Sequence, residues 1–147
     1  MAYDIRELFA RLIKCEAGGE GDTGMKAVAT VVMNRVNVPN GEYLRTGQGD
    51  LRKVLSQRGQ FDCMTSILAG MPNPQTIWSN PPEQIHYDIA DWALAGNKIF
   101  DVGFCLWYFN PFQPTCPSVF PPNGSGSIAT RIEQHCFYNP TRLYYLT

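Results

Sequence analysis

The segment from Asp22 or Thr23 to about Val36 limits how this chain can fold, because its apolar residues occupy nearly every side of a helix. A helix without a polar face has to be surrounded by other elements, so we expect it to lie in the middle of the domain. The turn residues 38–41, with the sequence VPNG, are expected to end it. Its apolar residues are Met25, Ala27, Val28, Ala29, Val31, Val32, Met33 and Val36.

The residues before this segment predict an amphipathic helix that ends beside a carboxylate. Asp4 can cap its first turn, and Glu7 three residues later completes a capping-box pattern. The next position on the apolar stripe is Glu16, which is followed by glycines that are expected to end the helix. The stripe consists of Ile5, Leu8, Phe9, Leu12 and Ile13, and the glycines are Gly18, Gly19 and Gly21.

The second half of the chain changes from helical to strand-like patterns. Residues 50–57 predict a short helix, and residues 85–93 predict a further helix that stops at Gly96 and Asn97. Residues 104–109 and 132–138 are aromatic and strand-like, with a long loop over residues 110–127 between them. We therefore expect an α+β fold in a single domain over residues 1–147, with the N-terminal helices packed on a small antiparallel sheet from the C-terminal half.

The charge balance argues against a polyanion as the main partner. Lysine and arginine number 12 and aspartate and glutamate 13, for a formal charge of −1 in 147 residues. Nucleic-acid affinity comes from clustered basic residues, and none of the charge is clustered here. No stretch approaches the roughly 20 apolar residues of a membrane span, and the start MAYDIRELF does not resemble a signal peptide. We expect synthesis in the cytoplasm.

Glu16 is the first candidate for chemistry. Burial on the apolar stripe and the negative end of the helix dipole would both disfavour its charged form and raise its pKa. A carboxylic acid that is still partly protonated near neutral pH can give a proton to a glycosidic oxygen. The alternative is an ordinary solvated carboxylate in the last turn of a helix. Glu20 is expected to be a solvated loop residue, or a helper that hydrogen-bonds nearby backbone.

The segment LIKCEAGGEGDTGMKAVATVVMNRV resembles the opening of the SleB/CwlJ-type cell-wall hydrolases, which degrade spore cortex peptidoglycan. Residues 106–111 (LWYFNP) and 131–141 (RIEQHCFYNPT) are similar to later elements of that family, and the combination is closest to the CwlJ branch. The matching residues are Glu16, Ala17, Gly19, Glu20, Gly24, Asn34, Arg35, Gln60 and Phe61.

This resemblance implies a small lysozyme-like domain whose sheet flanks a substrate groove, with Glu16 as the catalytic residue. It implies a lytic transglycosylase acting on the MurNAc–GlcNAc linkage of peptidoglycan during germination. The alternative is a hydrolytic muramidase or glucosaminidase, with Glu20 or an aspartate as a second group. It implies no cofactor and no metal, a spore coat protein as a partner, and deposition at the spore coat or outer spore surface.

Aromatic side chains are the natural platform for a sugar, because their faces match the apolar face of a pyranose. Strand alternation allows only one of Trp107 and Tyr108 to face the groove. Asn110 could orient an acetamido group, and His135 is expected to line the groove, to hold Glu16 in place, or to be purely structural. The predicted substrate-binding residues are Gln60, Phe61, Tyr108, Asn110 and Phe112, whereas Trp78 and Trp92 are expected to pack.

The five cysteines have no C-x-x-C spacing, and most are expected to be small buried apolar residues. A disulfide between Cys116 and Cys136 would staple the long loop, although cytoplasmic synthesis favours free thiols. Three other functions stay open. They are a zinc amidase using His86 and His135, a cysteine peptidase pairing Cys15, Cys63 or Cys105 with His135, and a coat protein that binds glycan without cleaving it.

Overall fold

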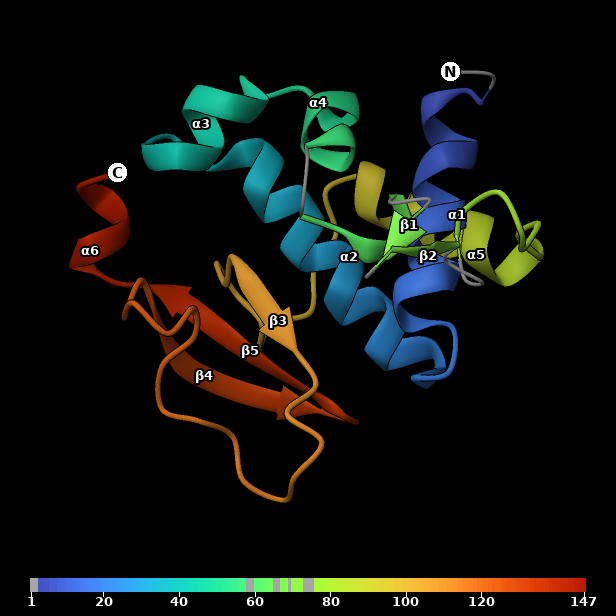
Figure 1. Ribbon diagram of the computed structural model, residues 1–147. Coiled ribbons are helices and arrows are strands. Elements are labelled where there is room, and N and C mark those ends of the chain that lie inside the picture. Colours follow the sequence, from blue (N-terminus) through green and yellow to red (C-terminus); the bar gives the residue numbers. More distant parts are fainter. Residues whose placement is uncertain (1–2, 58–59, 65–66, 69, 73–75) are drawn as a thin grey trace.

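Helix α2 (Gly21–Asn37) lies at the centre of the protein, as its apolar sequence predicts (Figure 1). In the computed structural model, which describes residues 3–57, 60–64, 67–68, 70–72 and 76–147, this helix contacts four other helices and two strands. The buried positions run along its whole length, from Gly24 to Arg35. Polar members of this set, such as Asn34 and Arg35, are buried because their side chains bond to backbone carbonyls of other segments.

Helix α1 (Ile5–Ala17) packs against α2 and α5 (Gln84–Leu94), and its predicted stripe enters the core. The side chain of Asp4 caps it by accepting a hydrogen bond from the backbone N–H of Glu7 at 2.8 Å. Glu7 does not complete the capping box, because its carboxylate accepts a hydrogen bond from Arg11 one turn later. None of the helices in the described segments has the length and apolar content that crossing a bilayer requires.

Four short segments surround these helices. Helix α4 (Leu51–Ser56) begins where the sequence predicts, with Asp50 as its N-cap. A 3₁₀ turn, η1 (Asp62–Met64), packs on α1, and the strands β1 (Ile67–Leu68) and β2 (Met71–Pro72) form a separate ribbon. Helix α3 (Gly41–Gly47) was not predicted, since the turn residues before it suggested a loop.

Helix α3 begins at Gly41 because the ring of Tyr144, from the C-terminal end of the chain, packs against the backbone of Gly41. Gly41 has φ +77°, and a Cβ there would lie 2.5 Å from the ring of Tyr144. Tyr144 belongs to the C-terminal helix α6 (Arg142–Tyr145). The hydroxyl of Tyr144 accepts a hydrogen bond from the backbone N–H of Tyr43. The two ends of this contact are separated by about 100 residues of sequence, so local patterns could not predict it.

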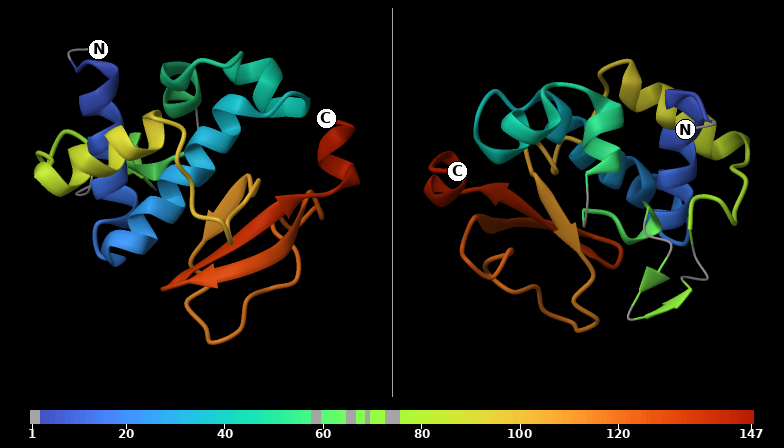
Figure 2. Two further views of the ribbon diagram at one scale, coloured as in Figure 1. Left: turned by 180° about the vertical axis from the view of Figure 1, so that it is seen from behind. Right: turned by 45° about the horizontal axis from the view of Figure 1, so that its top comes forward.

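The C-terminal half forms one antiparallel sheet in the order β3-β5-β4 (Figure 2). Its strands are β3 (Trp107–Phe109), β4 (Gly126–Ile132) and β5 (His135–Pro140). The predicted strand at 132–138 was wrong in extent, because a turn at Glu133, with φ 52°, separates β4 from β5. Strand β4 therefore begins in the last two residues of the predicted long loop and covers residues 128–131, which had been assigned to no element. The α+β class with helices on a small antiparallel sheet is confirmed.

The two faces of this sheet belong to different apolar clusters. Tyr108 and Phe137 lie on the face that packs on the helical core. Trp107, Cys136 and Tyr138 face a second cluster with Tyr43 and Tyr144. Strand alternation thus places Trp107 in a core and turns Tyr108 toward α1, one of the two arrangements that the sequence allowed.

Candidate active site

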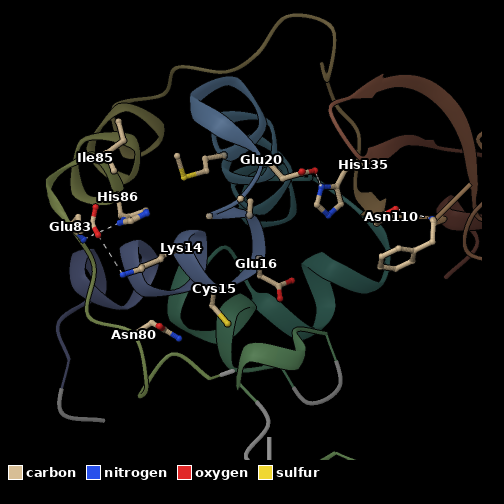
Figure 3. A pocket seen from close by; sticks show the side chains of 15 residues that line it. Lys14, Cys15, Glu16, Glu20, Asn80, Glu83, Ile85, His86, Asn110 and His135 are labelled. Carbon is tan, nitrogen blue, oxygen red and sulfur yellow. Dashed lines mark hydrogen bonds and ion pairs between the residues drawn. The ribbon is translucent and has the colours of Figure 1, made fainter. Parts of the chain in front are cut away.

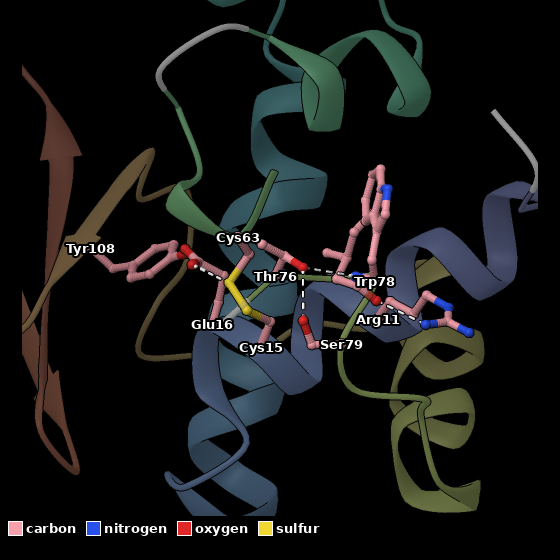
Figure 4. The surroundings of a disulfide bond; sticks show 9 residues. Arg11, Cys15, Glu16, Cys63, Thr76, Trp78, Ser79 and Tyr108 are labelled. Carbon is pink, nitrogen blue, oxygen red and sulfur yellow. Dashed lines mark hydrogen bonds between the residues drawn. A yellow bond between two sulfur atoms is a disulfide. The ribbon is translucent and has the colours of Figure 1, made fainter. Parts of the chain in front are cut away.

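Glu16 lies in the last turn of α1, where two residues from distant segments meet its carboxylate (Figure 4). The phenol of Tyr108 on β3 donates a hydrogen bond to Oε1 at 2.7 Å. The Sγ of Cys63 in η1 lies 3.0 Å from Oε2. Cys63 forms a disulfide with Cys15, so its sulfur carries no proton and the second contact is not a hydrogen bond donated to Glu16.

The pKa of Glu16 is raised above its ordinary value, mainly because burial removes water from the carboxylate. The hydrogen bond from Tyr108 opposes this shift, Asp62 adds to it by charge repulsion, and Arg35 opposes it by attraction. The pKa of Tyr108 is raised well above its usual value by its own burial and then by Glu16, so the phenol keeps the proton that it donates. The direction expected for Glu16 from its helical phase is confirmed.

Glu20 is not a solvated loop residue, because the C-terminal sheet covers it. Its Oε1 lies 2.5 Å from Nδ1 of His135 and accepts a hydrogen bond from the backbone N–H of Gln134 at 3.1 Å. The side chains of Glu20 and His135 are 12% and 13% exposed. A Cβ on Gly24 would lie 2.5 Å from Cβ of Glu20, so the glycine leaves room for this carboxylate. Glu20 therefore ties the start of α2 to the β4–β5 turn.

His135 connects this pair to Glu16. Its ring meets the ring of Tyr108 edge to face, with centroids 5.3 Å apart. Since Tyr108 in turn donates to Glu16, the order of contacts is Glu20, His135, Tyr108, Glu16. His135 thus positions the partner of Glu16 and also lines the cavity described next.

A cavity of about 990 Å³ opens beside Glu16 (Figure 3). At one end of it lie side chains from α1, from α5 and from the segment between β2 and α5. At the other end lie side chains that follow β3 or begin β5. The first group comprises Lys14, Asn80, Glu83, Ile85 and His86, and the second comprises Asn110 and His135. Phe112 also lines the cavity.

Two of the predicted binding residues, Asn110 and Phe112, line this cavity and do not belong to the hydrophobic core. Phe112 is 89% exposed. The backbone N–H of Phe112 donates a hydrogen bond to Oδ1 of Asn110 at 2.8 Å, and Phe112 has φ 52°. These features form a tight turn that fixes the backbone of Phe112 at the cavity. Asn110 itself is half-buried.

Tyr108, which was also predicted to bind substrate, is not on the cavity wall in the described residues and contacts Glu16 instead. Two other predicted binding residues do not fit that role either. Phe61 is 2% exposed and packs in the helical core with the Arg35 guanidinium over its ring, so its face is not open to a sugar. The Oε1 of Gln60 accepts hydrogen bonds from Arg35 and from the hydroxyl of Tyr43. In the described part of the chain, neither residue belongs to the cavity wall. Both residues are placed where they are because the buried guanidinium of Arg35 needs an acceptor, which Gln60 supplies, and a packing surface, which Phe61 supplies.

Of the two tryptophans that were predicted to pack, one does and one does not. Trp92 is half-buried against the core, as expected. Trp78 is 55% exposed, so its predicted packing role was wrong, and it makes only an edge contact with Tyr3 among the aromatic rings of the described residues.

The cysteines differ most from expectation. Both Cys15–Cys63 and Cys116–Cys136 are disulfides, the second of which was left open by the sequence and the first not foreseen. The thiol of Cys105 is buried, and this burial raises its pKa to about 12. A cysteine peptidase pairing any of Cys15, Cys63 and Cys105 with His135 therefore lacks a nucleophilic thiolate.

The zinc amidase alternative finds no set of ligands in the part of the chain that is described, where no three histidine, cysteine, aspartate or glutamate side chains gather. The Nδ1 of His86 accepts a hydrogen bond from the backbone N–H of Glu83 at the start of α5. Burial, and then the charge of Lys14, lower the pKa of His86. Sequence reasoning did not place Lys14 and Asn80 on the cavity wall, because no periodic signal marks a groove formed by separate segments.

Helices packed on a small antiparallel sheet, with the largely desolvated carboxyl of Glu16 beside a cavity, make this a lysozyme-like domain. A family model described as Cell Wall Hydrolase matches residues 19–138, and the chain belongs to that family. The matched region begins three residues after Glu16 and includes Glu20. The evidence that Glu16 is the candidate acid is therefore the geometry of the site and not the family match.

Sequence relatives agree with this membership, and a solved structure shares the fold. The chain is 28% identical over 135 residues to the cell wall hydrolase CwlJ of Bacillus subtilis, covering 92% of this chain and 84% of that protein. The CwlJ of Halalkalibacterium halodurans is also 28% identical, with 92% and 85% covered. The catalytic domain of the germination-specific lytic transglycosylase SleB from Bacillus anthracis has the same fold, with a TM-score of 0.65, 21% identity, and 94% and 98% covered.

Proposed function

We propose that this protein cleaves the glycan strands of peptidoglycan, with Glu16 as general acid and then general base. The observation that carries the proposal is the placement of the Glu16 carboxyl. It lies on the wall of a large cavity, is largely shielded from water, and has one oxygen held by Tyr108. A carboxylic acid with a raised pKa is the proton donor that a glycosidic oxygen requires.

The reaction proceeds as a lytic transglycosylation. Glu16 gives its proton to the oxygen that links MurNAc to GlcNAc, and the bond from that oxygen to the anomeric carbon breaks. The resulting carboxylate then takes the proton of the C6 hydroxyl, whose oxygen attacks the anomeric carbon and forms a 1,6-anhydro ring. One carboxyl group performs both transfers, so no second acid has to activate water, unlike in the two-carboxylate hydrolases.

Tyr108 supports both halves of this cycle. Its hydrogen bond to Oε1 leaves Oε2 to carry the proton, and the same bond stabilises the carboxylate after the proton has left. Because Tyr108 is itself fixed by the ring of His135, the orientation of the acid does not depend on the substrate.

Hydrolysis is the second candidate, because Glu20 lines the same cavity and could serve as a second acid. Its bonds to His135 and to the backbone of Gln134 argue for a positioning role, and they leave the single-acid route as the better supported one.

The setting proposed for this activity is the spore cortex during germination, with the protein deposited in the coat or outer spore layers and held there by a coat protein. The germination-specific role of SleB, whose catalytic domain shares this fold, supports the germination part of this setting. Two disulfides add to the support, because such bonds persist in oxidising compartments outside the reduced cytoplasm.

Mass spectrometry of the products tests the proposal. Purified protein is incubated with cortex fragments, and the released muropeptides are analysed for anhydro ends, which are one water lighter than reducing ends. Glu16→Gln should form no product, whereas Asp101→Asn, at an exposed carboxylate away from the cavity, should cleave at the wild-type rate. Reducing ends would indicate hydrolysis, absence of product would indicate glycan binding alone, and an active Glu16→Gln variant would move the role to another acid such as Glu20.

A further inference from the structure

The Cys15–Cys63 disulfide lies against the candidate acid. It joins the last turn of α1 to η1, across 48 residues of sequence, and Cys15 is the residue directly before Glu16 (Figure 4). Cys63 is buried, whereas Cys15 is half-buried and lines the cavity. The crosslink is therefore placed where a small reagent in the cavity can reach it.

The contact between Cys63 and Glu16 has a definite polarity. The Sγ of a disulfide offers only lone pairs, and Oε2 of an ionised carboxylate also offers only lone pairs. At 3.0 Å the two atoms share a proton only if Glu16 supplies it, as an acid O–H directed at the sulfur. Oε1 already accepts the hydrogen bond of Tyr108, which leaves Oε2 as the oxygen that holds the proton.

We propose that the Cys15–Cys63 disulfide is a positioning element for the reaction, in which the Cys63 sulfur accepts a hydrogen bond from the acid form of Glu16. Reduction converts the same sulfur into a thiol, which donates to Oε2 and stabilises the carboxylate instead. In the oxidised protein a larger fraction of Glu16 is therefore protonated near neutral pH, and a dithiol reductant lowers that fraction. This inference rests on the proposed role of Glu16.

The redox step balances with a dithiol as the reductant. One thiolate of the reductant attacks a protein sulfur, the S–S bond of Cys15–Cys63 breaks, and the other protein sulfur leaves and takes up a proton. The second thiol of the reductant then attacks the mixed disulfide and releases the remaining protein sulfur, which also takes up a proton. The protein gains two S–H groups, and the reductant is oxidised to its cyclic disulfide. The thiol of Cys63 keeps its proton beside a carboxylate, since a neighbouring negative charge disfavours the thiolate.

Three other groups act on the protonation of Glu16 in the described part of the chain. Tyr108 from β3 donates to Oε1, Asp62 from η1 repels the carboxylate, and Arg35 from α2 attracts it. Reduction gives the sulfur opposite Oε2 a proton that it can donate. The expected result is a lower pKa for Glu16 and a shift of the alkaline limb of the pH–activity profile to lower pH by about one unit. At a fixed pH above that limb, the rate should fall about tenfold.

A matched pair of variants separates this role from a merely structural crosslink. Cys15→Ala with Cys63→Ala removes the disulfide and leaves no polar atom opposite Oε2. Cys15→Ala with Cys63→Ser removes the same disulfide but places a hydroxyl there, which donates to the carboxylate. The alkaline limb of the Ser variant should lie about one pH unit below that of the Ala variant. Identical profiles for the two variants would overturn the proposal, because a crosslink that only stabilises the fold is lost equally in both.

Direct titration of the Glu16 carboxyl gives a readout that does not depend on activity. The ¹³C shift of Glu16 is followed against pH in the oxidised protein and in the protein treated with dithiothreitol, with Glu16→Gln identifying the signal. The midpoint should fall on reduction in the wild type and stay unchanged in the double Ala variant, where Cys116–Cys136 is still reduced. An unchanged midpoint in the wild type would overturn the proposal. A falling midpoint together with an active Glu16→Gln variant would instead overturn the catalytic role of Glu16 while leaving the contact established.

Discussion

The Tyr108 hydroxyl lies 2.7 Å from Oε1 of Glu16, although 92 residues of sequence separate the two. Glu16 lies in the last turn of the first helix and Tyr108 lies on the first strand of the C-terminal sheet, so their hydrogen bond joins the two halves of the fold at the cavity. The bond also opposes the rise that burial causes in the pKa of Glu16. It is the contact from which most properties of the site follow.

Tyr108→Phe should move the alkaline limb of the pH–activity profile to higher pH. The substitution removes the hydroxyl that lowers the pKa of Glu16 and keeps the ring that packs on His135 and Phe137. We expect a shift of about one unit upward, and a lower maximal rate because the carboxylate loses its donor after the proton has left. Rates across pH with cortex fragments check this. A limb that stays in place would show that Tyr108 does not set the protonation of Glu16.

Glu16→Gln should stabilise the protein at neutral pH even though it removes activity. The folded-state pKa of Glu16 is raised, so the folded state binds the proton more tightly than the unfolded state does. Stability from this group is therefore present at low pH, and is lost as the pH rises from the unfolded pKa near 4.5 to the raised folded value. A neutral glutamine avoids that loss and still accepts from Tyr108.

Urea unfolding of wild type and Glu16→Gln at several pH values measures this effect. We expect the variant to be more stable by about 1 kcal/mol at pH 7, with the difference vanishing near pH 4. A variant whose stability relative to wild type is the same at pH 4 and at pH 7 would mean that burial does not penalise the carboxylate.

Glu20→Ala should destabilise the fold. It leaves His135 and the backbone N–H of Gln134 without their acceptor, at a site where both side chains of the pair are nearly buried. We expect a loss of about 2 kcal/mol in the free energy of unfolding, measured by urea at pH 7. Asp101→Ala, at an exposed carboxylate, should change the free energy by less than about 0.5 kcal/mol. Equal effects of the two substitutions would contradict the anchoring role of Glu20.

Phe112→Ala should weaken substrate binding and leave stability unchanged. The ring lines the cavity and is 89% exposed, so it contributes little to the core. We expect KM for soluble glycan fragments to rise about five-fold, the equivalent of one lost sugar–aromatic contact, with kcat nearly the same. Phe100→Ala is the matched control, since Phe100 is 92% exposed and does not belong to the cavity wall in the described residues. A rise of the same size in both variants would show that Phe112 has no specific contact.

Periodic patterns predicted the elements that have many local contacts. The apolar α2, the stripe and Asp4 cap of α1, and the existence of α5 were all readable, because burial of a helix face leaves a repeat of three to four residues in the sequence. Glu16 could be singled out in the same way, as a carboxylate at the next position of an apolar stripe. The resemblance to cell-wall hydrolases was likewise carried by linear motifs, and it is confirmed by the family match.

Elements held by distant partners were missed or misplaced. Helices α3 and α6 are short, and they form because Tyr144 packs beside Gly41 and bonds to the backbone of Tyr43. Strand β4 is rich in small and polar residues and has an exposed face, so only its pairing with β5 identifies it as a strand. Gln60 and Phe61 matched a family motif, yet their side chains serve the buried Arg35 rather than the cavity.

The amino-acid sequence by itself determined the central helix, the α+β class and the position of the acid along the chain, since each depends on residues near one another in sequence. Only the tertiary structure decided that Tyr108, Cys63 and the pair Glu20–His135 would surround that acid. A carboxylate acquires a useful pKa from the water it loses and from the donors and charges it meets, and those come from segments that folding alone brings together.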